Sequence, residues 1–241
     1  MPVPEFLRPD AAILALRPVV PTETTDAADT VGAFLHATLR PVLKLQNDLL
    51  LAVVADFVRD HHIILRPTDQ HHQLTELLGR NTKLRYTVVG LITAQLTAAE
   101  YAFYRSQRAE LNRRLLEMAL RPAVAAAPPV SSPVATAGDF LHATLRPVLK
   151  LQNDLLLAVV ADFVRDHHIT LRPTDQHHQL TELLTRNTKL RYTVLGLITG
   201  LFAAEEFGFY RLHRSELNRR LLEMAQHRVL DQAEAVVALA T

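Results

Sequence analysis

The segment that starts at Pro41 carries apolar residues over most of a helical surface. Between Pro41 and His62 they stand at positions 42, 43, 45, 49, 50, 53, 54, 57 and 58. This spacing is that of an α-helix, and the apolar surface is wider than one stripe, which is typical of a central helix packed on several sides. The remaining face follows an i, i+4 spacing and consists of Lys44, Asp48, Ala52, Ala55 and Arg59. We therefore predict a central helix over residues 41–62.

Three shorter helices are predicted after this one. Pro67 disfavours helical geometry at the residue before it, so the first helix ends there, and Thr68 is placed to cap a second helix that ends near Gly79. A third helix is predicted over residues 82–93. Thr97 and Glu100 have the spacing of a capping box and start a fourth helix that runs to residue 119. No stretch alternates as a β-strand does, so the predicted fold class is all-α.

The whole pattern occurs twice. Residues 34–118 return as residues 140–224, at an offset of 106, with 13 differences over 85 positions, ten of which fall at positions 94–109. A repeat of this length is a whole folding unit. We predict a helical domain at 33–119 and a second copy at 139–241, whose last helix extends through Val236. An Ala/Pro-rich linker at 120–138 joins them, and an extended leader at 1–32, with one short helix near Ala11–Ala15, precedes them.

Both copies keep the same apolar faces, so neither is a degenerate spacer. Two identical subunits with so wide an apolar surface suit a homodimer, and their fusion makes that dimer intramolecular with a self-complementary interface. The prediction is two tandem four-helix domains packed as a pseudo-twofold intramolecular dimer. Two independent domains on a flexible linker are the alternative.

Composition narrows the class of protein further. The 26 Lys and Arg residues nearly cancel the 25 Asp and Glu residues, which argues against a broad surface for nucleic acid or anionic membrane. Cysteine is absent, so the chain has no disulfide framework and no thiol chemistry. We find no secretory signal, and the most apolar stretch, Leu49 to Val58, is interrupted by Asp56 and too short to span a bilayer. We expect a cytoplasmic protein with no membrane partner.

Histidine is the residue type most suggestive of chemistry. Pairs of histidines follow aspartates on both sides of the first turn, in Asp60-His61-His62 and Asp69-Gln70-His71-His72, and the second copy repeats them. A divalent transition metal such as Zn, Fe or Ni is the cofactor that these side chains suit. The candidate ligands are His62, Asp69, His72, Glu76, His168, Asp175, His178 and Glu182.

A structural role competes with metal binding at these positions. Adjacent histidines point about 100° apart on a helix, so one metal cannot use both members of a pair. Histidine is also favoured at a helix C-terminus by the helix dipole, and Asp69 is explained by its place at the start of the second helix.

Basic residues in the third segment and on the fourth helix suggest a second alternative, a nucleic-acid-binding face. They are Arg80, Lys83, Arg85, Arg105, Arg108, Arg113 and Arg114. No stacking aromatics interleave with them, and Glu110 precedes Arg113 and Arg114 by three and four residues, as on a solvated helix surface. Nucleic acid is therefore not the expected partner.

No catalytic residues are predicted. The chain has no Gly-rich phosphate loop, nucleophile elbow, cysteine nucleophile or HExxH motif. An enzyme is therefore less favoured than a binding protein.

Several segments resemble a known family. They are TLRPVLKLQNDLLL at 38–51, Gly90-Leu91-Ile92, Tyr104, and the run from Leu111-Asn112-Arg113-Arg114 to Met118. The pattern resembles a small bacterial helical family of unassigned role, normally single-copy, whose members sometimes carry the label glyoxalase. Glyoxalases proper are βαβββ metalloenzymes, whereas this chain predicts no strands. The resemblance implies a helical fold and supplies no functional residues.

The function expected from these observations is that of a non-catalytic interaction or scaffold protein. Two fused copies of one helical unit present two copies of one surface, which raises avidity for a repeated or symmetric protein partner. A His-based metal-binding protein or metalloenzyme and a nucleic-acid-binding helical protein are the alternatives.

Overall fold

The computed structural model describes residues 30–66, 68–119 and 136–240, and within these residues the chain is helical with no β-strand. The first copy forms α2 (Val31–Phe34), η1 (Leu35–Leu39), α3 (Arg40–Leu45), α4 (Asn47–Asp60), α5 (Gln70–Arg80), α6 (Thr82–Thr93), α7 (Ala98–Ser106) and α8 (Arg108–Ala119). The second forms α9 (Ala137–Phe140), η2 (Leu141–Leu145), α10 (Arg146–Leu151), α11 (Asn153–Asp166), α12 (Gln176–Arg186), α13 (Thr188–Thr199), α14 (Ala204–Leu212), α15 (Arg214–Leu230) and α16 (Ala233–Ala240). The all-α prediction is confirmed for the described residues.

The first helical segment begins earlier than predicted. It starts at Val31, capped by the Thr30 hydroxyl, which accepts from the Ala33 N–H at 3.1 Å. Pro41 lies inside the segment, where its missing N–H and bulky ring prevent an ordinary helical turn. The chain passes it through the wider π-helical turn η1, in which the Arg40 N–H reaches back to the Leu35 carbonyl. The prediction of a start at Pro41 was therefore wrong, and the leader and linker boundaries at 32 and 138 each include helical residues.

The other helix boundaries agree with the sequence in part. The third helix is α6, as predicted, and Asn81 caps it by accepting from the Leu84 N–H at 3.1 Å. Asp69, not Thr68, stands at the N-cap of α5. The capping box of Thr97 and Glu100 is formed.

Three predicted continuous helices are each divided. The central helix predicted over residues 41–62 is divided at Gln46 into α3 and α4, and α4 ends at Asp60. The predicted fourth helix is divided at Gln107 into α7 and α8. The last helix does not continue unbroken to Val236, because α15 ends at Leu230 and α16 follows after a turn. The expected short helix near Ala11–Ala15 lies outside the described residues.

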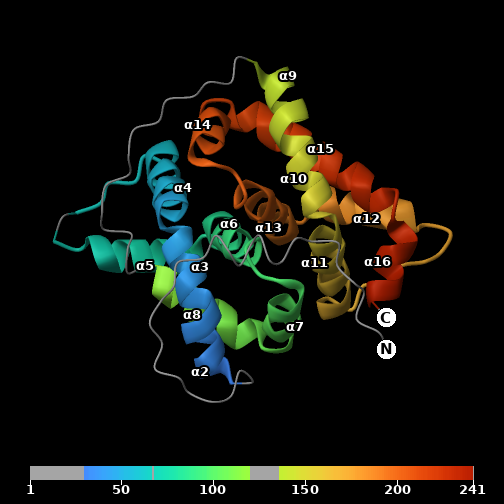
Figure 1. Cartoon of the computed structure of the whole chain (residues 1–241), viewed down its shortest axis with the longest axis horizontal. Helices are drawn as coiled ribbons and strands as arrows, with labels where there is room; N and C mark the ends of the chain where they lie inside the picture. The colour runs from blue at the N-terminus through green and yellow to red at the C-terminus, as the bar shows by residue number, and fades with distance from the viewer. Residues whose placement is uncertain (1–29, 67, 120–135, 241) are drawn as a thin grey trace.

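Helices α6 and α13 cross at the centre of the molecule (Figure 1), at the equivalent residues Gly90 and Gly196. A Cβ built on Gly90 lies 2.3 Å from the Thr193 carbonyl oxygen and 2.9 Å from the Gly196 Cα. A Cβ built on Gly196 meets the Thr87 carbonyl oxygen in the same way, at 2.2 Å. Only glycine allows two helix backbones to approach this closely.

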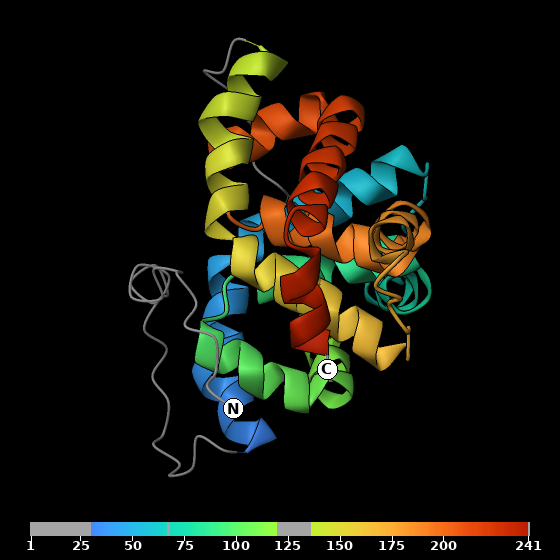
Figure 2. The same ribbon diagram turned by 90° about the vertical axis from the view of Figure 1, so that its right-hand side faces the viewer.

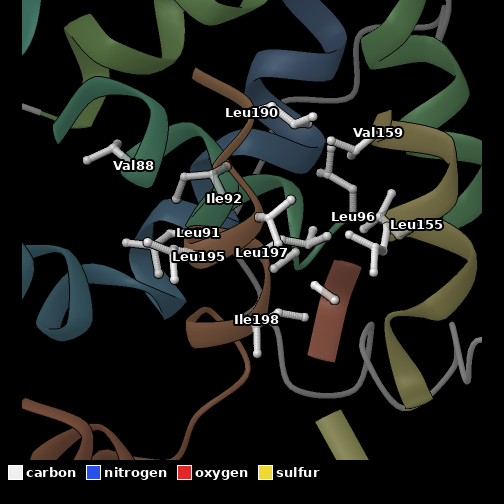
Figure 3. Packing of buried hydrophobic residues seen from close by; sticks show 14 of the residues in the cluster. Val88, Leu91, Ile92, Leu96, Leu155, Val159, Leu190, Leu195, Leu197 and Ile198 are labelled. Carbon is white, nitrogen blue, oxygen red and sulfur yellow. The ribbon is translucent and has the colours of Figure 1, made fainter. Parts of the chain in front are cut away.

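The apolar core surrounds this crossing. Figure 3 shows Leu91 and Ile92 of α6 beside Leu195, Leu197 and Ile198 of α13. Buried residues of both copies belong to one connected hydrophobic cluster. Burial of this shared apolar surface is the main favourable contribution to holding the two copies in contact.

Within the described residues, the second copy has a further helix after α15. Helix α16 packs along α11 (Figures 1 and 2) and also contacts α12 and α15. No helix in the described parts of the chain is long and apolar enough to cross a membrane.

Candidate functional site

Two buried aspartates join the copies reciprocally. Asp56 of α4 and Asp162 of α11 occupy equivalent positions and are 3% and 0% exposed. Each accepts hydrogen bonds from arginines of the other copy, Asp56 from α14 and Asp162 from α7 and the start of α8. A buried carboxylate is tolerated when it is paired and fully hydrogen-bonded, so these contacts fix how the copies meet.

Asp56 is held by a two-pronged contact. The Nε and Nη2 atoms of Arg211 donate to its two carboxylate oxygens at 2.7 and 2.5 Å. Arg59, one turn along α4, adds a third hydrogen bond at 2.6 Å. Arg214 donates to the neighbouring Asp60 at 2.9 Å. Bidentate pairing of this kind combines geometric specificity with charge.

Asp162 has the larger set of donors. Arg105 and Arg108 of the first copy contact its two oxygens at 2.8 and 2.5 Å, and Arg165 of its own helix also pairs with it. The Tyr101 hydroxyl donates to Asp162 Oδ2 at 2.9 Å. Phe207 stands at the Tyr101 position of the second copy, so Asp56 receives no such hydroxyl and the two sites differ in chemistry.

Buried glutamines make a second reciprocal contact. The side-chain N–H of Gln46 donates to the Gly200 carbonyl at 3.0 Å, and that of Gln152 donates to the Ala94 carbonyl at 3.2 Å. Both carbonyls lie at the C-cap positions of α13 and α6, where helices leave such groups without internal partners. These amides therefore satisfy helix ends that the shared core encloses.

Only weak signals of this interface are present in the sequence. Asp56 and its equivalent Asp162 each interrupt an otherwise apolar run, which by itself argues only against a membrane span. Arg105 and Arg108 were assigned to a basic surface. The presence of an aspartate at the same position of an apolar helical face in both copies was the signal that could have identified this interface.

Three of the five tyrosines are buried near these contacts. Burial and the Asp162 carboxylate raise the pKa of Tyr101 well above its ordinary value, and burial does the same for the pKa of Tyr104. Burial raises the pKa of Tyr210 to about 12. All three are therefore neutral hydrogen-bonding groups at neutral pH.

Ionisation of these tyrosines is expected to unfold the protein in alkali. Because their pKa values are higher in the folded chain, the stability they contribute is complete below about pH 10, the ordinary pKa of tyrosine. This stability is lost as the pH rises above about 10. For Tyr210 the loss continues as the pH passes its folded-state pKa of about 12. Near-ultraviolet tyrosinate absorbance should rise late, together with loss of helical circular dichroism. Tyr101→Phe, the residue found at the equivalent position, should reduce the late absorbance rise by about a third. Full ionisation near pH 10 with helicity retained would contradict this account.

The candidate metal ligands lie on the surface. His62 and His168 adopt left-handed backbone conformations, with φ of 50° and 51°, directly after α4 and α11. The His62 N–H donates to the Arg59 carbonyl and the Ile63 N–H to the Val58 carbonyl, which is the Schellman arrangement that ends a helix. The equivalent bonds form around His168. These two histidines therefore have a structural role in helix termination.

The other candidate ligands are likewise exposed. They are Asp69, His72, Glu76, Asp175, His178 and Glu182. Glu76 pairs with Arg80 and Glu182 with Arg186, each at 2.5 Å on its own helix. Among the described residues, no three His, Cys, Asp or Glu side chains come together as a metal site requires.

The basic residues named as a nucleic-acid face are largely engaged elsewhere. Arg105 and Arg108 face Asp162, as described above. Arg113 and Arg114 pair with Glu110 along the surface of α8, and Arg80 pairs with Glu76. Pairing with carboxylates removes the excess positive charge that phosphate binding requires.

Each copy carries a groove between its first helical segment and its α8 or α15 helix. The groove of the first copy measures about 880 Å³, and that of the second about 710 Å³. The positions that line both are histidine, arginine, leucine, lysine and methionine: His36, Arg40, Leu43, Lys44 and Met118, with His142, Arg146, Leu149, Lys150 and Met224. The two grooves thus share basic and apolar side chains, and acidic residues also line them, Asp48 and Glu117 in the first and Asp231 in the second.

The chain was also compared with known proteins. No known protein family, curated protein or solved structure matches it.

Proposed function

We propose that the chain is a pseudo-twofold intramolecular dimer of two helical domains, and that it acts as a non-catalytic scaffold with two copies of one binding surface. The reciprocal contacts support the first part. Asp56 with Arg211 and Asp162 with Arg105 are the same pair of positions, each joining one copy to the other. In a twofold arrangement, each residue of one copy makes the same contact with the other copy as its equivalent residue makes in return.

The paired grooves carry the second part of the proposal. His36, Arg40 and Lys44 follow an i, i+4, i+8 spacing along one side of the first groove, and no ion pair to another described residue involves Arg40 or Lys44. Arginine and lysine side chains without an ion pair among the described residues, together with Leu43 and Met118 in the same groove, suit an acidic, amphipathic segment of a protein partner. The second groove repeats these residues, so a partner with two such segments, or a symmetric partner, gains avidity.

Quantitative recovery of partners from the native host tests this function. The full chain is compared with three variants: Arg40→Glu with Lys44→Glu, Arg146→Glu with Lys150→Glu, and all four together. For a bivalent partner, blocking either groove should weaken binding at least about tenfold, and blocking both should abolish it. A partner that binds the fourfold variant as tightly as the original chain would contradict the grooves as the shared surface.

The resemblance to the helical family labelled glyoxalase stays an expectation. It adds no residue to the proposed function.

A further inference from the structure

Helices α4 and α11 have the same amino-acid sequence but different surroundings. Both read NDLLLAVVADFVRD, and in the second copy α16 packs along α11. Ala161 of α11 is 1% exposed, whereas the equivalent Ala55 of α4 is exposed. The same change holds for Leu155 and Val164, which are 1% and 3% exposed, while Leu49 and Val58 remain half-buried. Among the described residues, this helical face is therefore covered in the second copy and not in the first.

Helix α16 shows what chemistry this face accepts. It buries Ala233 and Val236, at 3% and 0% exposure. At its start, the Gln232 side chain donates to Asn153 Oδ1 at 2.9 Å. At its end, Arg165 donates to the Leu239 carbonyl at 3.3 Å. The contact consists of a small apolar stripe with one polar interaction at each end.

Helix α4 carries the same two polar residues that contact α16 from α11. Asn47 occupies the Asn153 position, and Arg59 occupies the Arg165 position with 65% of its side chain exposed. An arginine at this place can donate to the final carbonyls of a docked helix, which have no partner within that helix. The open face thus combines an apolar stripe, an amide at one end and a cation at the other.

We propose that the face of α4 around Ala55, between Asn47 and Arg59, is a docking site for a short helix of a partner protein with the chemistry of α16. That helix would present alanine and valine three residues apart, with its C-terminal carbonyls over Arg59. Apart from Asn47, which also lines the first groove, this site shares no residue with the paired grooves, and it exists once per chain.

The linker between the copies is a poor source of this helix, and occupancy by the leader, with its expected short helix near Ala11–Ala15, is one outcome of the peptide test. The first-copy residues equivalent to α16 are 127–134 and include prolines at 128, 129 and 133, whereas α16 has none. Exchange of α16 with another molecule of this protein would add no contact, because the helix would leave an identical face uncovered on its own α11. A separate partner is the occupant that adds contact.

A helical peptide with the sequence of residues 231–241 is the probe. A covalent bridge between positions 234 and 238, both exposed in α16 and one turn apart, holds it helical and lowers the ordering cost of binding. Its binding to the full chain is measured by fluorescence anisotropy. Ala55→Glu should weaken binding at least tenfold, and Arg59→Glu at least threefold. Ala109→Glu, at an exposed alanine of α8, should leave it unchanged.

Each other outcome would overturn the proposal. Binding that survives Ala55→Glu would place the peptide elsewhere, for example on α11 after displacement of α16. Absence of saturable binding to the original chain would mean that other residues of this chain cover α4. A dimer in sedimentation that Ala55→Glu dissociates would make a second copy the occupant. Because none of these variants touches the grooves, failure here leaves the proposed scaffold function to its own test.

Discussion

Replacing Gly90 with alanine is expected to cost the folded protein about 3 kcal/mol or more. The added methyl group would lie 2.3 Å from the Thr193 carbonyl oxygen and 2.8 Å from the Leu197 nitrogen. Both atoms belong to the backbone of α13, so no side chain can move aside, and the two helices must separate along the shared core. For a chain of this length, such a loss lowers the Tm by roughly 10 °C. Thermal and urea unfolding followed by circular dichroism measure it, and Gly196→Ala should behave alike.

Gly79→Ala provides the matched control. This glycine lies in α5, and a Cβ built on it has nothing within 4 Å. Because glycine is a poorer helix former than alanine, Gly79→Ala should stabilise the protein by about 0.5–1 kcal/mol. Opposite changes in the free energy of unfolding for the same glycine-to-alanine substitution would show that the close helix approach lies at Gly90. Equal effects at both positions would contradict the crossing of α6 and α13.

Asp162→Ala is expected to have the second largest effect, a loss of about 3 kcal/mol. The change removes the common partner of Arg105, Arg108 and Arg165 and leaves the Tyr101 hydroxyl without its acceptor. The arginines are 26–39% exposed, so water compensates part of the loss and the effect should stay at the lower end of the range for buried pairs.

Asp166→Ala tests whether burial causes this effect. Asp166 also pairs with Arg108, but 44% of its side chain is exposed, so its removal should cost less than about 1 kcal/mol. Asp162→Asn keeps the shape and part of the hydrogen bonding and should fall between the two. A loss at Asp166 as large as that at Asp162 would show that the buried position carries no special weight.

Local rules explain which parts of the fold could be predicted. The extent of α6 and the capping box at Thr97 depend on residues within a few positions of each other. The π-helical turn at Pro41 was missed because a proline suits both a helix start and a bulge inside a helix, and only packing of the preceding residues decides between them.

The candidate site depends on contacts between residues that are distant in sequence. Asp56 and Arg211 are 155 positions apart, and nothing near either residue indicates the other. The role of Gly90 cannot be predicted from the sequence either. A glycine within a helix indicates either a locally less stable helix or a close approach of another helix, and only the packed partner decides between them. The sequence around His62 suits a metal ligand, but its place after a helix equally suits the left-handed cap that the structure shows. What the sequence could show was the repeat itself, and with it the expectation that every such contact occurs twice.

The two copies are in direct, reciprocal contact within one chain. A double-mutant cycle on Asp56 and Arg211, with each changed to alanine alone and together, measures that contact from the free energies of unfolding. Because the pair is buried and bidentate, the account predicts a coupling energy of about 2 kcal/mol, against about 0.3–0.5 kcal/mol for the surface pair Glu110 and Arg114 within α8. Additive effects of the two substitutions, with no coupling beyond that of the surface pair, would contradict it.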